Sequence, residues 1–228
     1  MIRVGLLGTG RIGRLHAETI ASHSESSLHA VSDIDSESAN ELANQYGVTV
    51  KPADDVISDP NVDAILIATS TDTHSEFIEK ASLAGKAILC EKPVDLNLNR
   101  AKECLDKVST ANNSIMIGFN RRFDPNFAQL KKSLDNGEIG NRELLTITSF
   151  DPAPPPISYI KTSGGLYRDM MIHDFDLSNF IMGELPISIS AVGHSLVDPA
   201  IGVAGDVDTA VVTMSYADGK IAVIKNSR

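Results

Sequence analysis

Short strand-like segments alternate with helix-like segments from the start of the chain to about residue 120. The strand-like segments are rich in β-branched residues, and those between them carry apolar residues at helical spacing. This alternation is typical of a parallel sheet covered by helices on both faces. With right-handed crossovers it predicts a doubly wound Rossmann sheet in a domain of residues 1–120. The predicted strands are residues 2–7, 28–32, 64–68, 87–90 and 115–118.

Three helices of this domain are predicted from apolar stripes. One stripe precedes Gly47, which stands where a C-terminal helix cap is expected, and predicts a helix over residues 36–46. The other two lie in the first helix and in the segment before residue 115. The stripes are Ile12, Leu15, Thr19 and Ile20; Ala39, Leu42, Ala43 and Tyr46; and Leu98, Ala101, Leu105 and Val108.

The pattern changes after Asn120, and residues 121–228 are predicted to form an α+β domain with a mainly antiparallel sheet. Asp218-Gly219 predicts a hairpin between the last two strands. The second strand of that hairpin ends the chain with nothing after it, so we expect an uncovered edge and a domain that is incomplete at its C-terminal end. The predicted elements are helices near 127–134 and from Gly164 to about 182, and strands near 143–150, 187–195, 207–216 and 220–226.

Composition excludes several classes of partner. Thirty acidic residues against 20 basic residues give a formal net charge of −10, which argues against nucleic-acid and anionic-membrane partners. The longest apolar runs fall far short of the roughly 20 residues of a membrane span, and the first residues lack a signal-peptide pattern. We therefore expect a cytoplasmic protein. Cys90 and Cys104 are expected to be reduced packing residues rather than a disulfide or a metal site.

A glycine pattern follows the first predicted strand. Gly8-Thr9-Gly10-Arg11-Ile12-Gly13 fits G-x-G-x-x-G and opens the first predicted helix. Such glycines permit a tight turn and a close approach of the backbone to a pyrophosphate, which the N–H groups of the helix N-terminus can bind. We expect Gly8, Gly10, Arg11, Ile12 and Gly13 to bind a dinucleotide. A glycine-rich turn without a ligand is the alternative.

The cofactor prediction rests on Asp33, which ends the second predicted strand 25 residues after Gly8. A carboxylate there can accept hydrogen bonds from the adenosine ribose and would repel a 2′-phosphate, so it favours NAD over NADP. No arginine stands between Arg14 and Arg100 to bind such a phosphate. A role for Asp33 in the turn or the helix entry is the alternative.

Two further segments carry groups suited to hydride transfer. Lys92, in Glu91-Lys92-Pro93, follows the strand at 87–90, at the edge of the sheet where ligands of doubly wound folds bind. Its charge could stabilise a developing alkoxide, although a surface lysine is the simpler interpretation. On one helix, Asp169 and His173 would be i, i+4 neighbours sharing a face with Asp176, and a histidine between carboxylates can act as a general base. A surface ion pair is the alternative, and a metal site is disfavoured because there is no second cluster.

These motifs together resemble the Gfo/Idh/MocA family of oxidoreductases. The motifs are G-T-G-R-I-G, A-T-S-T-D-T-H, C-E-K-P, G-F-N-R-R-F-D-P-N-F and D-M-M-I-H-D-F-D, in that order. The resemblance covers essentially the whole chain, and within the family D-P-A-P-P-P and A-G-D-V-D-T-A are similar to the inositol 2-dehydrogenase branch. It implies NAD-linked oxidation of myo-inositol to scyllo-inosose by hydride transfer. Members of the family continue beyond the point that matches Arg228.

The resemblance also implies the roles of particular residues. Lys92, Asp169 and His173 match the catalytic trio and would also bind the substrate: His173 takes the hydroxyl proton, and Lys92, paired with Asp169, polarises the oxygen. Arg121 matches a substrate-contacting arginine, and its neighbour Arg122 would shape the same wall. The residues that match the cofactor side of the site are Thr69, Ser70, Thr71, His74 and Glu91. Ser70 stands where many relatives have proline.

Other functions and partners stay open on the sequence. The same trio would serve a dehydrogenase of another sugar or polyol, because loops read the geometry of the hydroxyl groups. A catalytically idle NAD-binding regulatory protein is the alternative outside enzymes. We also expect a homo-dimer or homo-tetramer, because the available helices cannot cover every apolar residue of the second sheet. The apolar residues in question include Ile187, Ile189, Val211 and Ile221.

Overall fold

A computed structural model describes all 228 residues. The chain divides into two compact units, Met1–Gly118 and Phe119–Arg228. The first unit has two apolar clusters, and the second unit has one of its own. Each unit is described below by itself.

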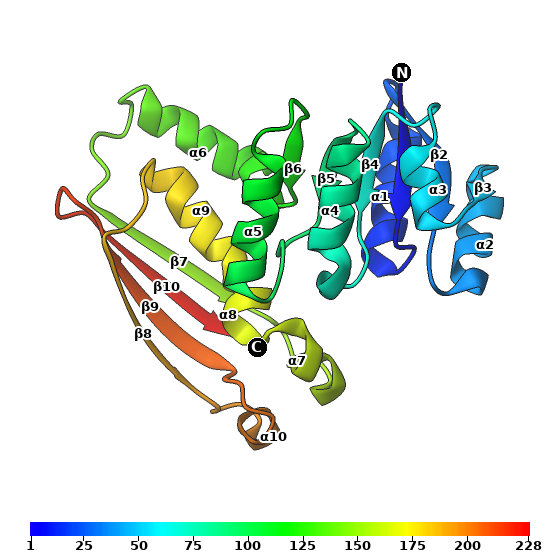
Figure 1. Cartoon of the computed structure of the whole chain (residues 1–228). Helices are drawn as coiled ribbons and strands as arrows, with labels where there is room; N and C mark the ends of the chain where they lie inside the picture. The colour runs from blue at the N-terminus through cyan, green and yellow to red at the C-terminus, as the bar shows by residue number, and fades with distance from the viewer. The chain divides into compact units, whose positions relative to one another are not determined.

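The first unit is built on a six-stranded parallel sheet with the strand order β3-β2-β1-β4-β5-β6 (Figure 1). The order reverses between β1 and β4, which is the mark of a doubly wound Rossmann fold. The predicted fold class is therefore confirmed, and the short edge strand β3 is the one that the sequence did not predict. The strands are β1 (Ile2–Leu7), β2 (Ser26–Ser32), β3 (Thr49–Val50), β4 (Ala64–Ile67), β5 (Ala87–Cys90) and β6 (Ile115–Ile117).

Helices cover both faces of this sheet because side chains alternate along each strand. On β4, Ile65 and Ile67 pack with helices α3, α4 and α5, whereas Leu66 packs with helices α1 and α2 on the opposite face. The helices are α1 (Arg11–Ser22), α2 (Ser36–Tyr46), α3 (Ala53–Ser58), α4 (His74–Leu83) and α5 (Leu98–Val108), with a 3₁₀ turn η1 (Thr71–Thr73) before α4. The carboxyl ends of the strands thus lead into the loops that carry the predicted cofactor residues.

Helix α2 has the bounds that the sequence predicts because local groups define both of its ends. Asp35 caps its N-terminus by accepting hydrogen bonds from the N–H groups of Glu37 and Ser38 (3.0 and 3.2 Å). Gly47 ends the helix in the left-handed region, at φ +67°, and donates its N–H to the carbonyl of Ala43.

Two other predicted stripes are only partly correct. On α1 the buried residues are Gly13, Ala17 and Ile20, whereas Leu15 is exposed. On α5, Cys104 and Val108 are buried, whereas Leu98 and Leu105 are exposed. Small side chains let each helix lie close to the sheet, and this turns the larger predicted residues toward solvent.

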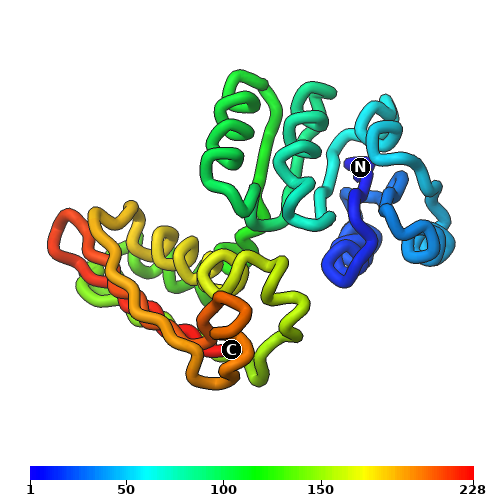
Figure 2. Tube along the Cα trace, turned by 60° about the horizontal axis from the view of Figure 1, so that its bottom comes forward, coloured from blue at the N-terminus to red at the C-terminus, as the bar shows by residue number.

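The second unit contains a four-stranded mixed sheet with the order β7-β10-β9-β8 (Figures 1 and 2). The expectation that the last strand forms an uncovered edge is wrong. Strand β10 pairs in parallel with β7 and antiparallel with β9, so the edges are β7 and β8. The helices between β7 and β8 return the chain to the far edge, which leaves the place beside β7 for β10. The strands are β7 (Leu144–Phe150), β8 (Ser188–His194), β9 (Thr209–Ser215) and β10 (Ile221–Ser227).

The helix predicted from Gly164 to about residue 182 is two helices, α8 (Gly165–Asp169) and α9 (Ile172–Met182). The i→i−4 ladder is interrupted between them: the N–H of Met171 donates to Leu166, and that of His173 donates to Met170 rather than to Asp169. Asp169 and His173 therefore lie on different helices, and the predicted i, i+4 relationship is wrong. The remaining elements are η2 (Asn120–Phe123), α6 (Pro125–Asp135), α7 (Ile157–Ser163) and α10 (Pro199–Val203).

Helix α9 covers one face of the second sheet, along which it runs in Figure 2. Its residues Leu177 and Ile181 pack in one buried cluster with Val212 and Ile224 of the central strands. The buried cluster of this unit contains no helix residue that packs on the opposite face of the sheet. No helix of the structure is both long and apolar enough to cross a membrane.

Candidate functional site

The glycine loop between β1 and α1 has the geometry that a dinucleotide requires. Gly8 has φ +95°, and a Cβ atom there would lie 2.3 Å from the carbonyl oxygen of Ala68. A Cβ atom at Gly13 would lie 2.0 Å from the oxygen of Gly8, so the helix can pack this closely only with glycine. A Cβ atom at Gly10 would meet nothing within 4 Å, which leaves that stretch of backbone open to a ligand.

The N-terminus of α1 is suited to a phosphate. Gly10 is its N-cap, and neither a side-chain cap nor an acidic residue in the first turn competes for the N–H groups of Arg11, Ile12 and Gly13. These N–H groups carry the positive end of a 12-residue helix. The residues therefore fit the pyrophosphate of a dinucleotide.

Asp33 is held against this loop. Its Oδ2 accepts hydrogen bonds from the N–H of Thr9 (2.6 Å) and the Thr9 hydroxyl (3.0 Å), and its Oδ1 accepts from the N–H of Asp35 (2.9 Å). Burial raises the pKa of Asp33, but these hydrogen bonds outweigh it and hold the pKa below its usual range. The carboxylate is thus charged at neutral pH and fixed at the carboxyl end of β2. The side chain of Ile34, beside it, is fully exposed.

An arginine does lie near the loop after β2. The sequence shows no arginine between Arg14 and Arg100, but Arg14 itself reaches the start of α2, where its Nη2 donates to Ser38 Oγ (3.0 Å) and Glu41 Oε2 (2.9 Å). A guanidinium is therefore present close to the loop after β2, and Glu41 pairs with it. The preference for NAD that the sequence predicts therefore rests on Asp33 alone, and not on an absence of arginine.

The loop after β4 holds the residues that match the cofactor side of the family site. The hydroxyl groups of Thr69 and Thr73 lie 2.7 Å apart, and Ser70 is exposed ahead of η1, which begins at Thr71. His74 differs from the expectation, because it is only 1% exposed. Its Nδ1 lies 2.8 Å from the carbonyl oxygen of Pro93 and its Nε2 lies 3.0 Å from that of Thr69. Both ring nitrogens thus face main chain, and His74 braces the loop instead of offering a polar atom to a cofactor.

Lys92 follows β5 directly, in a turn that we call the Lys92 turn (Glu91, Lys92 and Pro93). The Lys92–Pro93 peptide is cis. Glu91 Oε1 lies 2.7 Å from Nε2 of His16 on α1. Burial raises the pKa of Glu91, but the hydrogen bond and charge of His16, together with the N–H of Lys92, outweigh it and lower the pKa. Sequence reasoning missed His16, which only the parallel sheet brings beside the end of β5.

Asp169 and His173 lie in the second unit. Asp169, at the end of α8, accepts hydrogen bonds from Nη1 of Arg228 (3.1 Å) and from the Tyr159 hydroxyl (2.9 Å). His173, near the start of α9, has its ring edge-to-face with Phe119, with 6.5 Å between the ring centroids. Asp169 thus lies within a set of charged and hydroxyl partners that the sequence did not predict.

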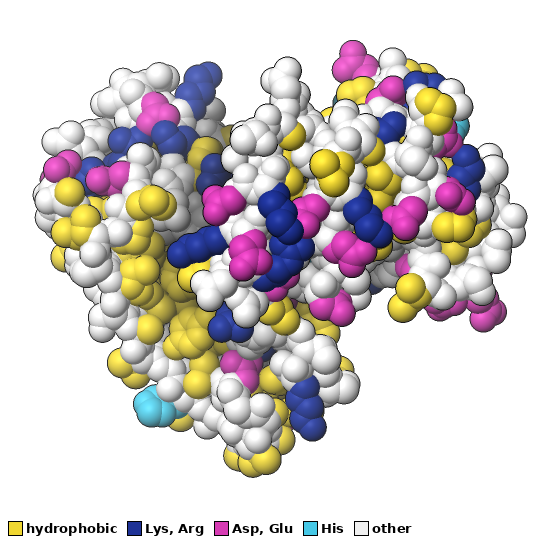
Figure 3. Space-filling view, in the orientation of Figure 1, with side chains coloured by type: hydrophobic (Ala, Val, Ile, Leu, Met, Phe, Trp, Pro, Cys, Tyr) yellow, Lys and Arg dark blue, Asp and Glu magenta, His cyan; other side chains and the backbone are white.

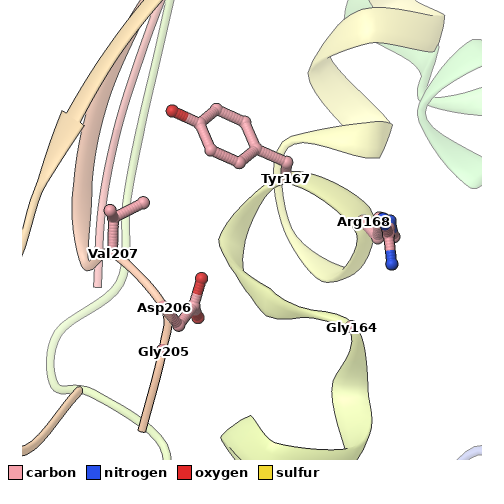
Figure 4. Close-up of a pocket in the computed structure, with 6 residues that line it drawn as sticks. All are labelled: Gly164, Tyr167, Arg168, Gly205, Asp206 and Val207. Carbon is pink, nitrogen blue, oxygen red and sulfur yellow. The ribbon is translucent and has the colours of Figure 1, made fainter. Parts of the chain in front are cut away.

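The partner of Asp169 is itself held by a second carboxylate. Arg228 is almost fully buried, and its Nη2 donates to Asp206 Oδ2 (2.8 Å). Asp206 also accepts a hydrogen bond from the N–H of Leu166 (3.1 Å). It lines a pocket together with Tyr167, which points toward the strands, and Arg168, which points away from them (Figure 4). One arginine therefore bridges the two aspartates.

Arg121 and Arg122 also have fixed partners. Arg121 donates to the fully buried carboxylate of Asp174, which further accepts from the Ser149 hydroxyl (2.9 Å). Arg122 pairs with Asp176 through Nε (2.7 Å) and Nη2 (2.5 Å). Asp176 lies on α9 three residues after His173, whereas Asp169 lies on α8, so the expectation of one helix face holds only for His173 and Asp176. No three His, Cys, Asp or Glu side chains come together in a way that could hold a metal ion.

A Rossmann fold, an open glycine loop and a carboxylate at the end of β2 are typical of the dinucleotide-binding domain of a nicotinamide-dependent enzyme. Comparison with known proteins identifies the family. The model of the GFO/IDH/MocA oxidoreductase family, described as an NAD-binding Rossmann fold, matches residues 2–119, and the GFO/IDH/MocA C-terminal domain matches residues 127–228. The chain belongs to this family, so the predicted family, NAD as cofactor and dehydrogenase activity are confirmed.

Individual relatives are similar over the whole chain. It is 48% identical to the inositol 2-dehydrogenase of Rhizobium meliloti (strain 1021) and 46% identical to the myo-inositol 2-dehydrogenase of Thermotoga maritima, covering 100% of this chain and 69% of each relative. A crystal structure of scyllo-inositol dehydrogenase from Lactobacillus casei, with bound NAD(H) and scyllo-inositol, is similar with a TM-score of 0.88 and 29% identity. That match covers 100% of this chain and 70% of the other.

Proposed function

We propose that the protein oxidises myo-inositol to scyllo-inosose with NAD. The observation that carries the proposal is 48% identity over the whole chain to a protein named inositol 2-dehydrogenase, with Lys92, Asp169 and His173 all present. The open glycine loop and the fixed carboxylate of Asp33 support the cofactor side of the reaction.

In the proposed mechanism the three residues of the trio act together on one hydroxyl group of the substrate. NAD, which the glycine loop and Asp33 would hold, would supply the acceptor for the hydride. His173 takes the proton from the reacting hydroxyl as general base, and Lys92 stabilises the negative charge that develops on the oxygen. Asp169 pairs with Lys92 and fixes its direction. Lys92 belongs to the first unit and the other two belong to the second, so their assembly is part of this proposal.

The surroundings of Asp169 support its proposed role. A carboxylate that must orient a lysine needs a fixed position, and Arg228 and Tyr159 provide two hydrogen bonds that fix it. Arg121, whose guanidinium is anchored on buried Asp174, is proposed to contact the substrate beside them, and Arg122, anchored on Asp176, to support that wall. Thr69, Ser70, Thr71 and the Lys92 turn are proposed to contact the nicotinamide half of the cofactor.

A second substrate has specific support, because scyllo-inositol is bound in the similar structure from Lactobacillus casei. The two inositols differ in the orientation of one hydroxyl group.

We expect NAD reduction with myo-inositol, at a kcat/KM at least about tenfold above that with scyllo-inositol, glucose or sorbitol. Absorbance of NADH under matched conditions measures the ranking. A higher kcat/KM with scyllo-inositol would transfer the assignment to that isomer, and NAD binding without turnover of any polyol would favour the regulatory function.

Asp33 provides a test of the cofactor assignment. Replacing Asp33 with serine removes a charged hydrogen-bond acceptor from the proposed ribose site, so we expect the Kd for NAD to rise by about 10- to 100-fold. Discrimination against NADP should fall, because the carboxylate no longer repels a 2′-phosphate. Adding Glu41→Gln, which removes the carboxylate partner of Arg14, should raise the use of NADP further. The ratio of kcat/KM for the two cofactors measures both effects, and an unchanged ratio would contradict this role of Asp33.

We also propose that the outer face of the second sheet joins two copies of the chain. Val211 pairs with Val192 and Lys225 in the sheet, so these three side chains share the face opposite α9. Hydrophobic side chains gather over the strands of this sheet in Figure 3. The exposed apolar residues of the outer face include Leu144, Phe150, Val192, Val211 and Ile221. Of the residues expected at this interface, Ile187 and Ile189 are exposed, but the pairing of Ile189 with Met214 places it toward α9.

Sedimentation velocity tests this arrangement. Val211→Lys and Val192→Lys together place two charges on the outer face, and we expect them to convert a dimer or tetramer into smaller species. Val203→Lys, at an exposed apolar residue on α10, is the matched control. A chain that sediments as a monomer without any substitution would refute the proposal.

A further inference from the structure

Two histidines contact the Lys92 turn from different elements of the first unit. His16 comes from α1 and contacts Glu91, and His74 comes from α4 and contacts the carbonyl oxygen of Pro93. We infer that His16 and His74 are positioning residues that together set the place of Lys92. This inference rests on the proposed function, in which Lys92 acts on the substrate oxygen.

The first contact confines the carboxylate of Glu91. Its Oε1 is 2.7 Å from His16 Nε2, and the group also accepts a hydrogen bond from the N–H of Lys92. A Cβ atom added at Gly118 would lie 3.1 Å from Oε2, so the carboxylate also packs directly on the end of the neighbouring strand. Three sides of the carboxylate are therefore occupied, and one of its partners is the backbone of Lys92 itself.

The second contact fixes the other end of the turn. Both neighbours of the His74 ring, Thr69 O and Pro93 O, are carbonyl oxygens, which can only accept hydrogen bonds. The ring is enclosed, at 1% exposure, between these two oxygens. It therefore joins the loop after β4 to the Lys92 turn.

The two contacts link Lys92 to both parts of the proposed cofactor site. Helix α1, which carries His16, begins at the glycine loop, and Thr69 lies in the loop proposed to contact the nicotinamide. A displacement of about 1 Å in a reacting group can lower a rate about 100-fold. The histidines thus act on the rate through the position of Lys92, without touching the substrate.

Glutamine variants test the inference in the full chain with myo-inositol as substrate. We expect His16→Gln and His74→Gln each to lower kcat by about 10- to 100-fold while the Kd for NAD, measured by calorimetry, changes less than about threefold. His29→Gln is the matched control, because His29 lies in the same unit and contacts a carboxylate, Asp59 (3.3 Å), outside the Lys92 turn. If His29→Gln lowered kcat to the same degree, the losses in the other two variants would reflect general destabilisation. That result would overturn the inference.

A double variant separates positioning from a structural effect. If the histidine acts through Lys92, then His16→Gln combined with Lys92→Met should be no slower than Lys92→Met alone, because contacting residues are non-additive. Additive losses would overturn the inference. An unchanged kcat in Lys92→Met alone would refute the proposed function instead, so the two failures are distinguishable.

Nuclear magnetic resonance gives a readout that is independent of turnover. In the chain without cofactor, the Lys92 ammonium resonance should shift in His16→Gln and in His74→Gln but not in His29→Gln. A Lys92 resonance that does not shift in either variant would overturn the inference. His74→Asn provides a second variant if His74→Gln does not fold.

Discussion

Replacing Lys92 with methionine lowers kcat by about 100- to 1,000-fold while the Kd for NAD stays within about threefold of its original value, and this is the largest kinetic effect that we expect. Methionine keeps an unbranched apolar side chain but removes the charge that, in the proposed mechanism, stabilises the developing alkoxide. The proposed adenosine and pyrophosphate contacts are at the glycine loop and Asp33, so we expect binding of the cofactor to be spared. NADH absorbance under single-turnover conditions measures the rate, and calorimetry measures the Kd.

Lys102→Met is the control for this substitution, because Lys102 is an exposed lysine on α5 of the same unit. It should leave both constants unchanged. If Lys92→Met raised KM and left kcat intact, Lys92 would contribute uniform binding instead of transition-state stabilisation. That result would remove Lys92 from the catalytic trio and leave the cofactor assignment in place.

Asp174→Ala destabilises the second unit by about 3–5 kcal/mol, the largest effect on stability that we expect. The carboxylate of Asp174 is fully buried and joins four elements, because it accepts from Arg121 on η2, Ser149 on β7 and Asn226 on β10. Removing it leaves a buried guanidinium edge and an amide without their acceptor. Differential scanning calorimetry, which can resolve the transitions of the two units, measures the loss.

Asp106→Asn on α5 is the matched control, since Asp106 is exposed and its side chain has no role in a buried network. It should change the unfolding free energy by less than about 0.5 kcal/mol. A loss of less than about 1 kcal/mol for Asp174→Ala would show that solvent reaches this site and satisfies Arg121. The proposed anchoring of the substrate wall by Asp174 would then be wrong.

The first unit could be predicted closely because its signals are local. Helix α2 is bounded by Asp35 and Gly47, and both caps act within three or four residues of themselves. The glycine loop is equally local, since the chain just before and after it forms the strand and helix that position it. Even here the contact between Arg14 and Glu41 was not predicted, because it joins two residues of different helices that are 27 positions apart in the chain.

The second unit could be predicted only in outline because its arrangement depends on distant pairings. The break between α8 and α9 is set by the packing of Leu166 and Met171 in the core, and the helical pattern of the sequence continues through it. Arg228 reaches Asp169 across 59 residues of chain, so no spacing rule could connect them. His16 escaped for the same reason, since parallel strands bring it to the Lys92 turn, and the contact of His74 with Pro93 was not predicted either.

The central position of β10 has a consequence for how the second unit folds. Ile221 pairs with Leu144, so the β7–β10 ladder joins segments 77 residues apart, and closing such a long loop is slow compared with forming the β9–β10 hairpin. During synthesis β7 leaves the ribosome early and stays without a neighbouring strand until β10 emerges. A nascent chain therefore exposes the apolar residues of β7 until β10 emerges and pairs with it.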